Sequence, residues 1–108
     1  MSKVTNLIIT FSTLEDEQLV IEQIKLFDQE LGFNIVSVND ERLPNVWYGG
    51  TRRLECCILI GAYNNLDLEK FILFLATKVE WEAADLVQLL VKEQEDMKFK
   101  LIDLSLKY

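Results

Sequence analysis

The sequence predicts an α+β domain with the β-α-β-β-α-β order of a ferredoxin-like sandwich, in which two helices cover one face of an antiparallel sheet. Three observations predict it. The chain opens on an alternating, β-branched segment, two later segments carry apolar residues at helical spacing, and a second strongly strand-like segment lies between them. Half of the 108 residues are apolar and one is proline, so we expect residues 1–108 to form a single domain.

The first strand is expected at residues 4–11, which are rich in β-branched side chains. Alternation places Leu7, Ile9 and Phe11 on one face of this strand. Ser12 and Glu15 then have the S-x-x-E spacing of a capping box, which predicts that a helix begins here. The helix would bury a stripe made by Val20, Ile24, Phe27 and Leu31, and Gly32 would end it.

A second strand is expected at residues 33–38, followed by a connection over residues 39–52. Residues 53–63 are the most strand-like part of the chain. One of their faces would carry Leu54, Cys56, Ile58, Ile60 and Ala62, and the other would have Cys57 and Leu59 at its centre. A strand that is apolar on both faces is typical of the middle of a sheet, so we expect this strand to be central and buried on both sides.

The second helix is expected at residues 66–78, with Asn64 and Asn65 supplying a turn and an N-cap. Its core face would consist of Leu68, Phe71, Ile72 and Leu75. From Val79 onward two structures fit the sequence. Either the helix continues to Met97, or residues 86–106 form a hairpin of two strands, in the first of which Val87, Leu89 and Val91 alternate with Gln88, Leu90 and Lys92. We favour the hairpin, because the continuous helix would be about 30 residues long, far above the average.

The composition excludes several functional classes. With 18 acidic and 11 basic side chains the net charge is −7, so binding to nucleic acid or to an anionic membrane is not expected, while a basic protein partner is acceptable. The chain has no histidine, which removes the common nucleophilic triads and zinc sites. The adjacent Cys56 and Cys57 lack C-x-x-C spacing. We therefore expect no enzyme activity, no cofactor and no metal.

The location expected from the sequence is the cytoplasm. No signal peptide is visible at the start of the chain, and no apolar run is long enough to span a bilayer. Adjacent cysteines in a strand point to opposite faces and cannot readily pair with each other, which fits a reducing compartment.

The candidate binding residues are aromatic and arginine side chains. Trp47, Tyr48, Arg52 and Arg53 are concentrated in the predicted connection. These residue types dominate protein interfaces, but the two aromatic rings could equally fold back over the sheet and complete the core. Tyr63, at the end of the expected central strand, and Trp81, after the second helix, are further candidates, although a lone Trp in such a position often closes the edge of a core.

These features predict a small non-enzymatic protein-interaction module. Its partner would be a second copy of the chain, giving a homodimer, or a basic protein, as for an inhibitor or immunity-type protein. The alternative from a different class is a small-ligand sensor, in which Arg52 and Arg53 would hold an anionic metabolite.

Overall fold

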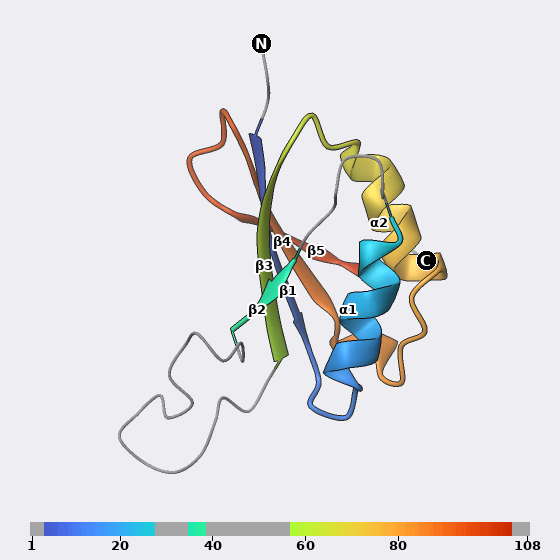
Figure 1. Cartoon of the computed structure of the whole chain (residues 1–108). Helices are drawn as coiled ribbons and strands as arrows, with labels where there is room; N and C mark the ends of the chain where they lie inside the picture. The colour runs from blue at the N-terminus through green and yellow to red at the C-terminus, as the bar shows by residue number, and fades with distance from the viewer. Residues whose placement is uncertain (1–3, 28–34, 39–56, 105–108) are drawn as a thin grey trace.

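The computed structural model describes residues 4–27, 35–38 and 57–104. Its elements, in chain order, are β1 (Val4–Phe11), α1 (Glu17–Lys25), β2 (Val36–Ser37), β3 (Cys57–Asn64), α2 (Leu68–Thr77), a short 3-10 turn (Ala84–Leu86), β4 (Gln88–Glu93) and β5 (Lys100–Asp103). Both helices lie on the same side of the sheet (Figure 1). The predicted α+β class, with two helices and an antiparallel sheet, is confirmed.

The strand order across the sheet is β2-β3-β1-β4-β5, and every neighbouring pair is antiparallel. Strand β5 lies beside β4 as the second arm of the favoured hairpin. The alternative of one helix reaching Met97 is wrong, because α2 ends at Thr77 and Val79 already lies buried in the core.

The hydrophobic core lies between the sheet and the two helices. Helix α1 buries Val20, Ile21 and Ile24, and helix α2 buries Phe71, Ile72 and Leu75. The sheet contributes Leu7, Ile9, Phe11, Cys57, Leu59, Leu89 and Val91, and Val87 joins them from the residue just before β4. The core face predicted for the second helix is therefore confirmed, and the residues that alternation groups together in the first strand and in the hairpin lie in the core.

The capping box predicted at Ser12 is wrong. Helix α1 is capped by Asp16, whose carboxylate accepts the Leu19 amide at 3.2 Å. Ser12 instead forms the turn before the helix, because its carbonyl accepts the Glu15 amide and its hydroxyl accepts the Leu14 amide. Glu15 is therefore not needed at the helix start, and its side chain is used elsewhere in the fold.

The N-cap of helix α2 is also an aspartate, Asp67, and not the residue expected from the sequence. The side chain of Asp67 accepts the Lys70 amide at 3.2 Å. Asn65 supplies the preceding turn with φ 56°, a left-handed conformation that Asn tolerates better than most residues. The turn was predicted correctly, whereas the N-cap lies two residues later than expected.

Strand β3 is interior, as predicted, but it is not buried on both sides. Cys57 and Leu59 face the helices and are buried. Ile58, Ile60 and Ala62 lie on the opposite face, where Ile60 is 41% exposed and Ala62 is also exposed. The middle strand of the five is β1. The two-sided apolar pattern therefore marks an apolar sheet face that the helices leave open.

Candidate functional site

The sequence-predicted site residues divide into two groups. Trp47, Tyr48, Arg52 and Arg53 lie outside the described residues. Tyr63 and Trp81 are described, and they lie at opposite ends of β1: Tyr63 is opposite Thr5 in the β1–β3 pairing, whereas the Trp81 ring packs on Phe11. The six residue steps from Thr5 to Phe11 correspond to about 20 Å of strand. The structure does not bring these two rings together.

Trp81 is anchored to the core. Its indole Nε1 donates to the Leu75 carbonyl at 2.8 Å, and its ring centroid lies 5.4 Å from that of Phe11 at a tilt of 55°. The side chain is half-buried and packs against the hydrophobic core. Trp81 therefore closes one end of the hydrophobic core. Both of these contacts, with Leu75 and with Phe11, lie within the fold.

Tyr63 also belongs to the helix-facing side of the sheet. It packs against the core, and its ring lies over Gly61, two residues earlier in the same strand. A Cβ atom on Gly61 would lie only 2.8 Å from Cζ of Tyr63, so the absence of a side chain at Gly61 makes room for the ring. Burial raises the pKa of the Tyr63 phenol well above its usual value of about 10.

The stability of the protein is expected to fall as the pH rises above about 10, and less steeply in Tyr63→Phe. In the folded state Tyr63 keeps its proton at a pH where the unfolded chain has lost it, so rising pH favours unfolding. A difference of one full proton between the folded and the unfolded state changes the free energy of unfolding by about 1.4 kcal/mol per pH unit. Solvent near the half-buried ring makes this slope smaller. Urea unfolding midpoints at several alkaline pH values would measure it, and identical slopes in both proteins would contradict the prediction.

The most extensive unusual feature of the described surface is an apolar row across the open face of the sheet. The backbone register places one residue from each strand in line: Val36, Ile60, Ile8, Leu90 and Leu101. All five are aliphatic. We call these five residues the apolar row.

The apolar row is accessible from solvent. Ile60 is 41% exposed and Leu101 is 59% exposed, while the other three members are partly buried by their neighbours. On β3 the row is widened by Ile58 on one side and Ala62 on the other. An apolar surface that is continuous over five strands differs from the scattered single residues that are normal on soluble proteins.

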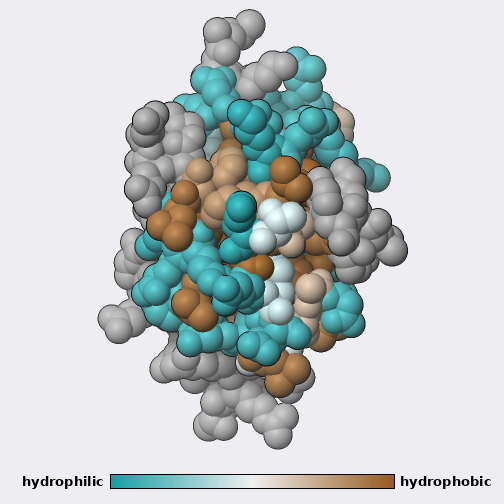
Figure 2. Space-filling model, turned by 90° about the vertical axis from the view of Figure 1, so that its right-hand side faces the viewer, coloured by the Kyte–Doolittle hydropathy of each residue, from teal (hydrophilic) through white to brown (hydrophobic). Residues whose placement is uncertain are grey.

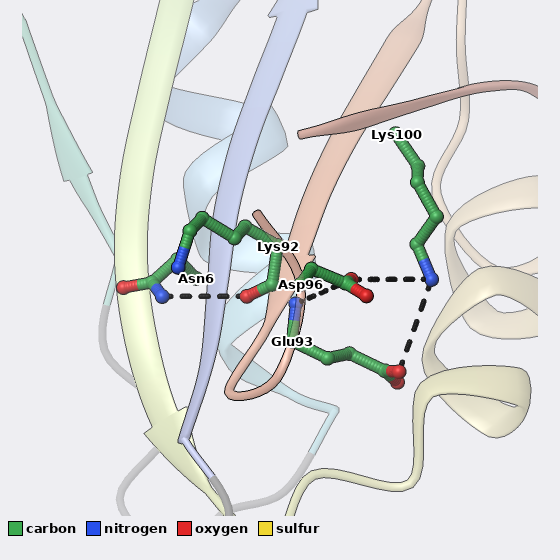
Figure 3. A network of polar contacts seen from close by, with 5 residues as sticks. All are labelled: Asn6, Lys92, Glu93, Asp96 and Lys100. Atoms are coloured by element: carbon green, nitrogen blue, oxygen red, sulfur yellow. Dashed lines mark hydrogen bonds and ion pairs between the residues drawn. The ribbon is translucent and has the colours of Figure 1, made fainter. Parts of the chain in front are cut away.

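Polar groups border the apolar row on β1 and β4. On one side the Thr10 hydroxyl donates to Oε1 of Gln88 at 3.3 Å. On the other side Nδ2 of Asn6 donates to the Lys92 carbonyl at 3.3 Å, and Figure 3 shows the Lys92 side chain extending over β1 toward Asn6. An apolar centre with a polar border is the usual composition of a protein interface.

The turn between β4 and β5 holds Leu101 in line with the rest of the row. The Asp96 carboxylate accepts the Glu93 amide at 3.0 Å and pairs with Nζ of Lys100 at 3.3 Å (Figure 3). These contacts, the backbone amide first and Lys100 after it, lower the pKa of Asp96. These contacts join the turn to Glu93 on β4 and Lys100 on β5, and the backbone pairing of the two strands sets Leu101 opposite Leu90.

The helix side of the molecule is different. Figure 2 looks onto this side, where apolar residues form separate patches between hydrophilic ones. Exposed leucines do occur on the helices, including Leu19 and Leu26 on α1 and Leu73 on α2, but no strand register aligns them. The open sheet face is therefore the stronger candidate for a functional surface.

Sequence reasoning missed that Ile8, Leu90 and Leu101 form one row. Alternation tells which face a residue occupies, whereas the row depends on which residues of different strands lie opposite one another. The one signal in the sequence was the two-sided apolar pattern of residues 53–63, which we interpreted as complete burial.

Two further features, a metal site and a membrane-spanning helix, are not found within residues 4–27, 35–38 and 57–104. No group of three or more His, Cys, Asp and Glu side chains in these ranges could hold a metal ion. None of the helices found there has the length and apolar character needed to cross a membrane.

Comparison with known proteins gives no information about the function of this chain. No protein-family model, no curated protein and no solved structure matches this chain.

Proposed function

We propose that this chain is a non-enzymatic protein-interaction module that uses the open face of its sheet as the docking surface. The observation that supports the proposal is the apolar row, which crosses all five strands and remains accessible at Ile60 and Leu101. Covering such a surface removes apolar area from water, which is the main driving force of protein association. A protein surface is the natural partner for a flat, apolar and extended face.

The open face is a poor fit for the two other partners considered. A basic protein would be bound by carboxylates, yet the exposed Glu80, Glu82 and Asp85 lie in the segment between α2 and β4 rather than in the apolar row. A small anionic ligand would need concave, convergent donors, and the arginines considered for that role, Arg52 and Arg53, lie outside the described residues. Neither a basic protein nor a small anionic ligand would use the apolar row as its binding surface.

The fold and location belong to the same proposal. The order β4-β1-β3-β2, with α1 after β1 and α2 after β3, is consistent with a ferredoxin-like sandwich to which β5 has been added. We place this module in the cytoplasm, where its acidic charge would keep it soluble and its cysteines reduced.

Site-specific photo-crosslinking would test the docking face in cells of the natural source. A photoreactive phenylalanine derivative at Ile60 is expected to give a discrete protein adduct, because this position is both exposed and inside the apolar row. The matched control is the same derivative at Leu73, which is 47% exposed but lies on α2. Adducts of equal yield from both positions, or none from Ile60, would refute the proposal.

A further inference from the structure

We infer that the occupant of the open face is a second copy of this chain, so that two sheets pack face to face in a symmetric dimer. This inference rests on the proposed function and adds the identity of the partner. In such a dimer the same patch is used on both protomers. The two sheets would pack about 10 Å apart with their strands aligned to within about 30°.

The charge distribution supports a second copy. The whole chain has a net charge of −7, which makes two copies repel each other. The apolar row itself carries no charge. In the rows next to it, among the side chains that the structure describes on these strands, the charged group is Lys92 on β4, whose sign is opposite to the net charge of the chain. Two copies therefore meet least repulsion when these faces meet.

The size of the face is sufficient for a weak dimer. Five strands spaced about 4.8 Å apart make a face about 24 Å wide, and the strands range from two residues in β2 to eight in β1 and β3. At about 3.3 Å per residue the projected area is on the order of 450 Å² per protomer, or about 900 Å² for the pair, which is in the range of weak and transient interfaces. We expect a dissociation constant in the micromolar range or weaker, on the order of 10 μM or more.

The competing geometry is edge pairing through β5, which would join two sheets into one. Strand β5 forms one edge of the sheet, next to β4. Ile60 distinguishes the two geometries, because β1 and β4 lie between its strand, β3, and the β5 edge. Edge pairing would leave Ile60 in solvent, whereas face-to-face packing would cover it.

Sedimentation equilibrium over a range from about 5 μM to 1 mM would test the inference on the full chain. The variants are Ile60→Lys and Leu101→Lys, with Leu73→Lys as the matched control on α2. Each lysine reduces the net negative charge by one, so any loss of the dimer reflects the lost apolar contact and the charge buried at the face and not a stronger overall repulsion between the chains. We expect each variant of the apolar row to raise the dissociation constant at least about tenfold and the control to leave it unchanged.

Salt provides a second readout. Because the contact is apolar and the two chains repel each other, higher ionic strength is expected to tighten the dimer. Binding through carboxylates to a basic surface would weaken instead.

Three results would overturn the inference: a monomer at all concentrations, a dimer that survives Ile60→Lys, or a dimer equally weakened by Leu73→Lys. A monomer whose Ile60 derivative still gives a specific adduct of another mass in cells would refute the homodimer while leaving the docking face in place. If the dimer is unaffected by Ile60→Lys and the derivative at Ile60 gives no adduct, both the homodimer through this face and the docking face itself are refuted.

Discussion

Glu15→Ala is expected to lower the free energy of unfolding by about 3 kcal/mol, because it removes two charge-assisted hydrogen bonds, each contributing roughly 1.5–3 kcal/mol. The Glu15 carboxylate is buried, with 7% exposure. Its Oε1 accepts the Glu82 amide at 2.9 Å, and its Oε2 accepts the Ala83 amide at 2.8 Å. It thus fastens the segment after α2 to the turn before α1, across 67 residues of sequence.

The segment after α2 should loosen first in this variant. Hydrogen exchange at the Glu82 and Ala83 amides is expected to accelerate more than exchange in the β-sheet, and the urea midpoint should fall at constant slope. Glu15→Gln is expected to be intermediate, because an amide offers one accepting oxygen while its NH2 group would face the second donor.

The matched control for Glu15 is Glu22→Ala. Glu22 is an exposed glutamate on α1, so its removal changes the net charge equally and should alter stability by no more than about 0.5 kcal/mol. If Glu15→Ala were no more destabilising than this control, the role of the carboxylate in holding the segment would be refuted.

Trp81→Ala is expected to destabilise the protein by about 3 kcal/mol, at the low end for a large aromatic residue because the side chain is half-buried. The loss combines the tilted contact with Phe11 and the hydrogen bond to the Leu75 carbonyl. Trp81→Phe keeps most of the ring contact and loses the donor, so it should cost about 1 kcal/mol.

The same pair of variants decides the role of Trp81. A structural tryptophan predicts lower thermal and urea midpoints in both variants, ordered as above. A tryptophan that serves a binding surface predicts unchanged midpoints and a weaker dimer. Unchanged stability in Trp81→Ala would therefore contradict the placement of this ring at the core.

Much of the fold could be predicted from local pattern. Alternation grouped Leu7 with Ile9 and Leu89 with Val91 on single strand faces, because a strand has only two faces, and the structure buries these residues in the core. Helical spacing likewise identified the buried face of α2. These predictions hold because each depends on residues that are neighbours within a single element.

Helix caps were predicted less well. Ser12 and Glu15 match the capping box, yet Asp16 caps α1, and Asp67 rather than an asparagine caps α2. Several residues in each turn are capable of capping, and local sequence does not choose among them. At α1 the choice depends on Glu15 being used for the distant Glu82 and Ala83 amides.

The sequence by itself determined the α+β class, the two helices, the core face of the second helix, and which residues share a face in the first strand and in the hairpin. Only the tertiary structure decided how the chain leaves α2, because Glu15 and Gln23 accept the amides of Glu82, Ala83 and Glu80 across more than 50 residues. It also decided that Ile60 belongs to an open face and that five aliphatic residues align there. Strand register joins residues that are far apart in the chain, so a pattern with a period of two residues cannot reveal it.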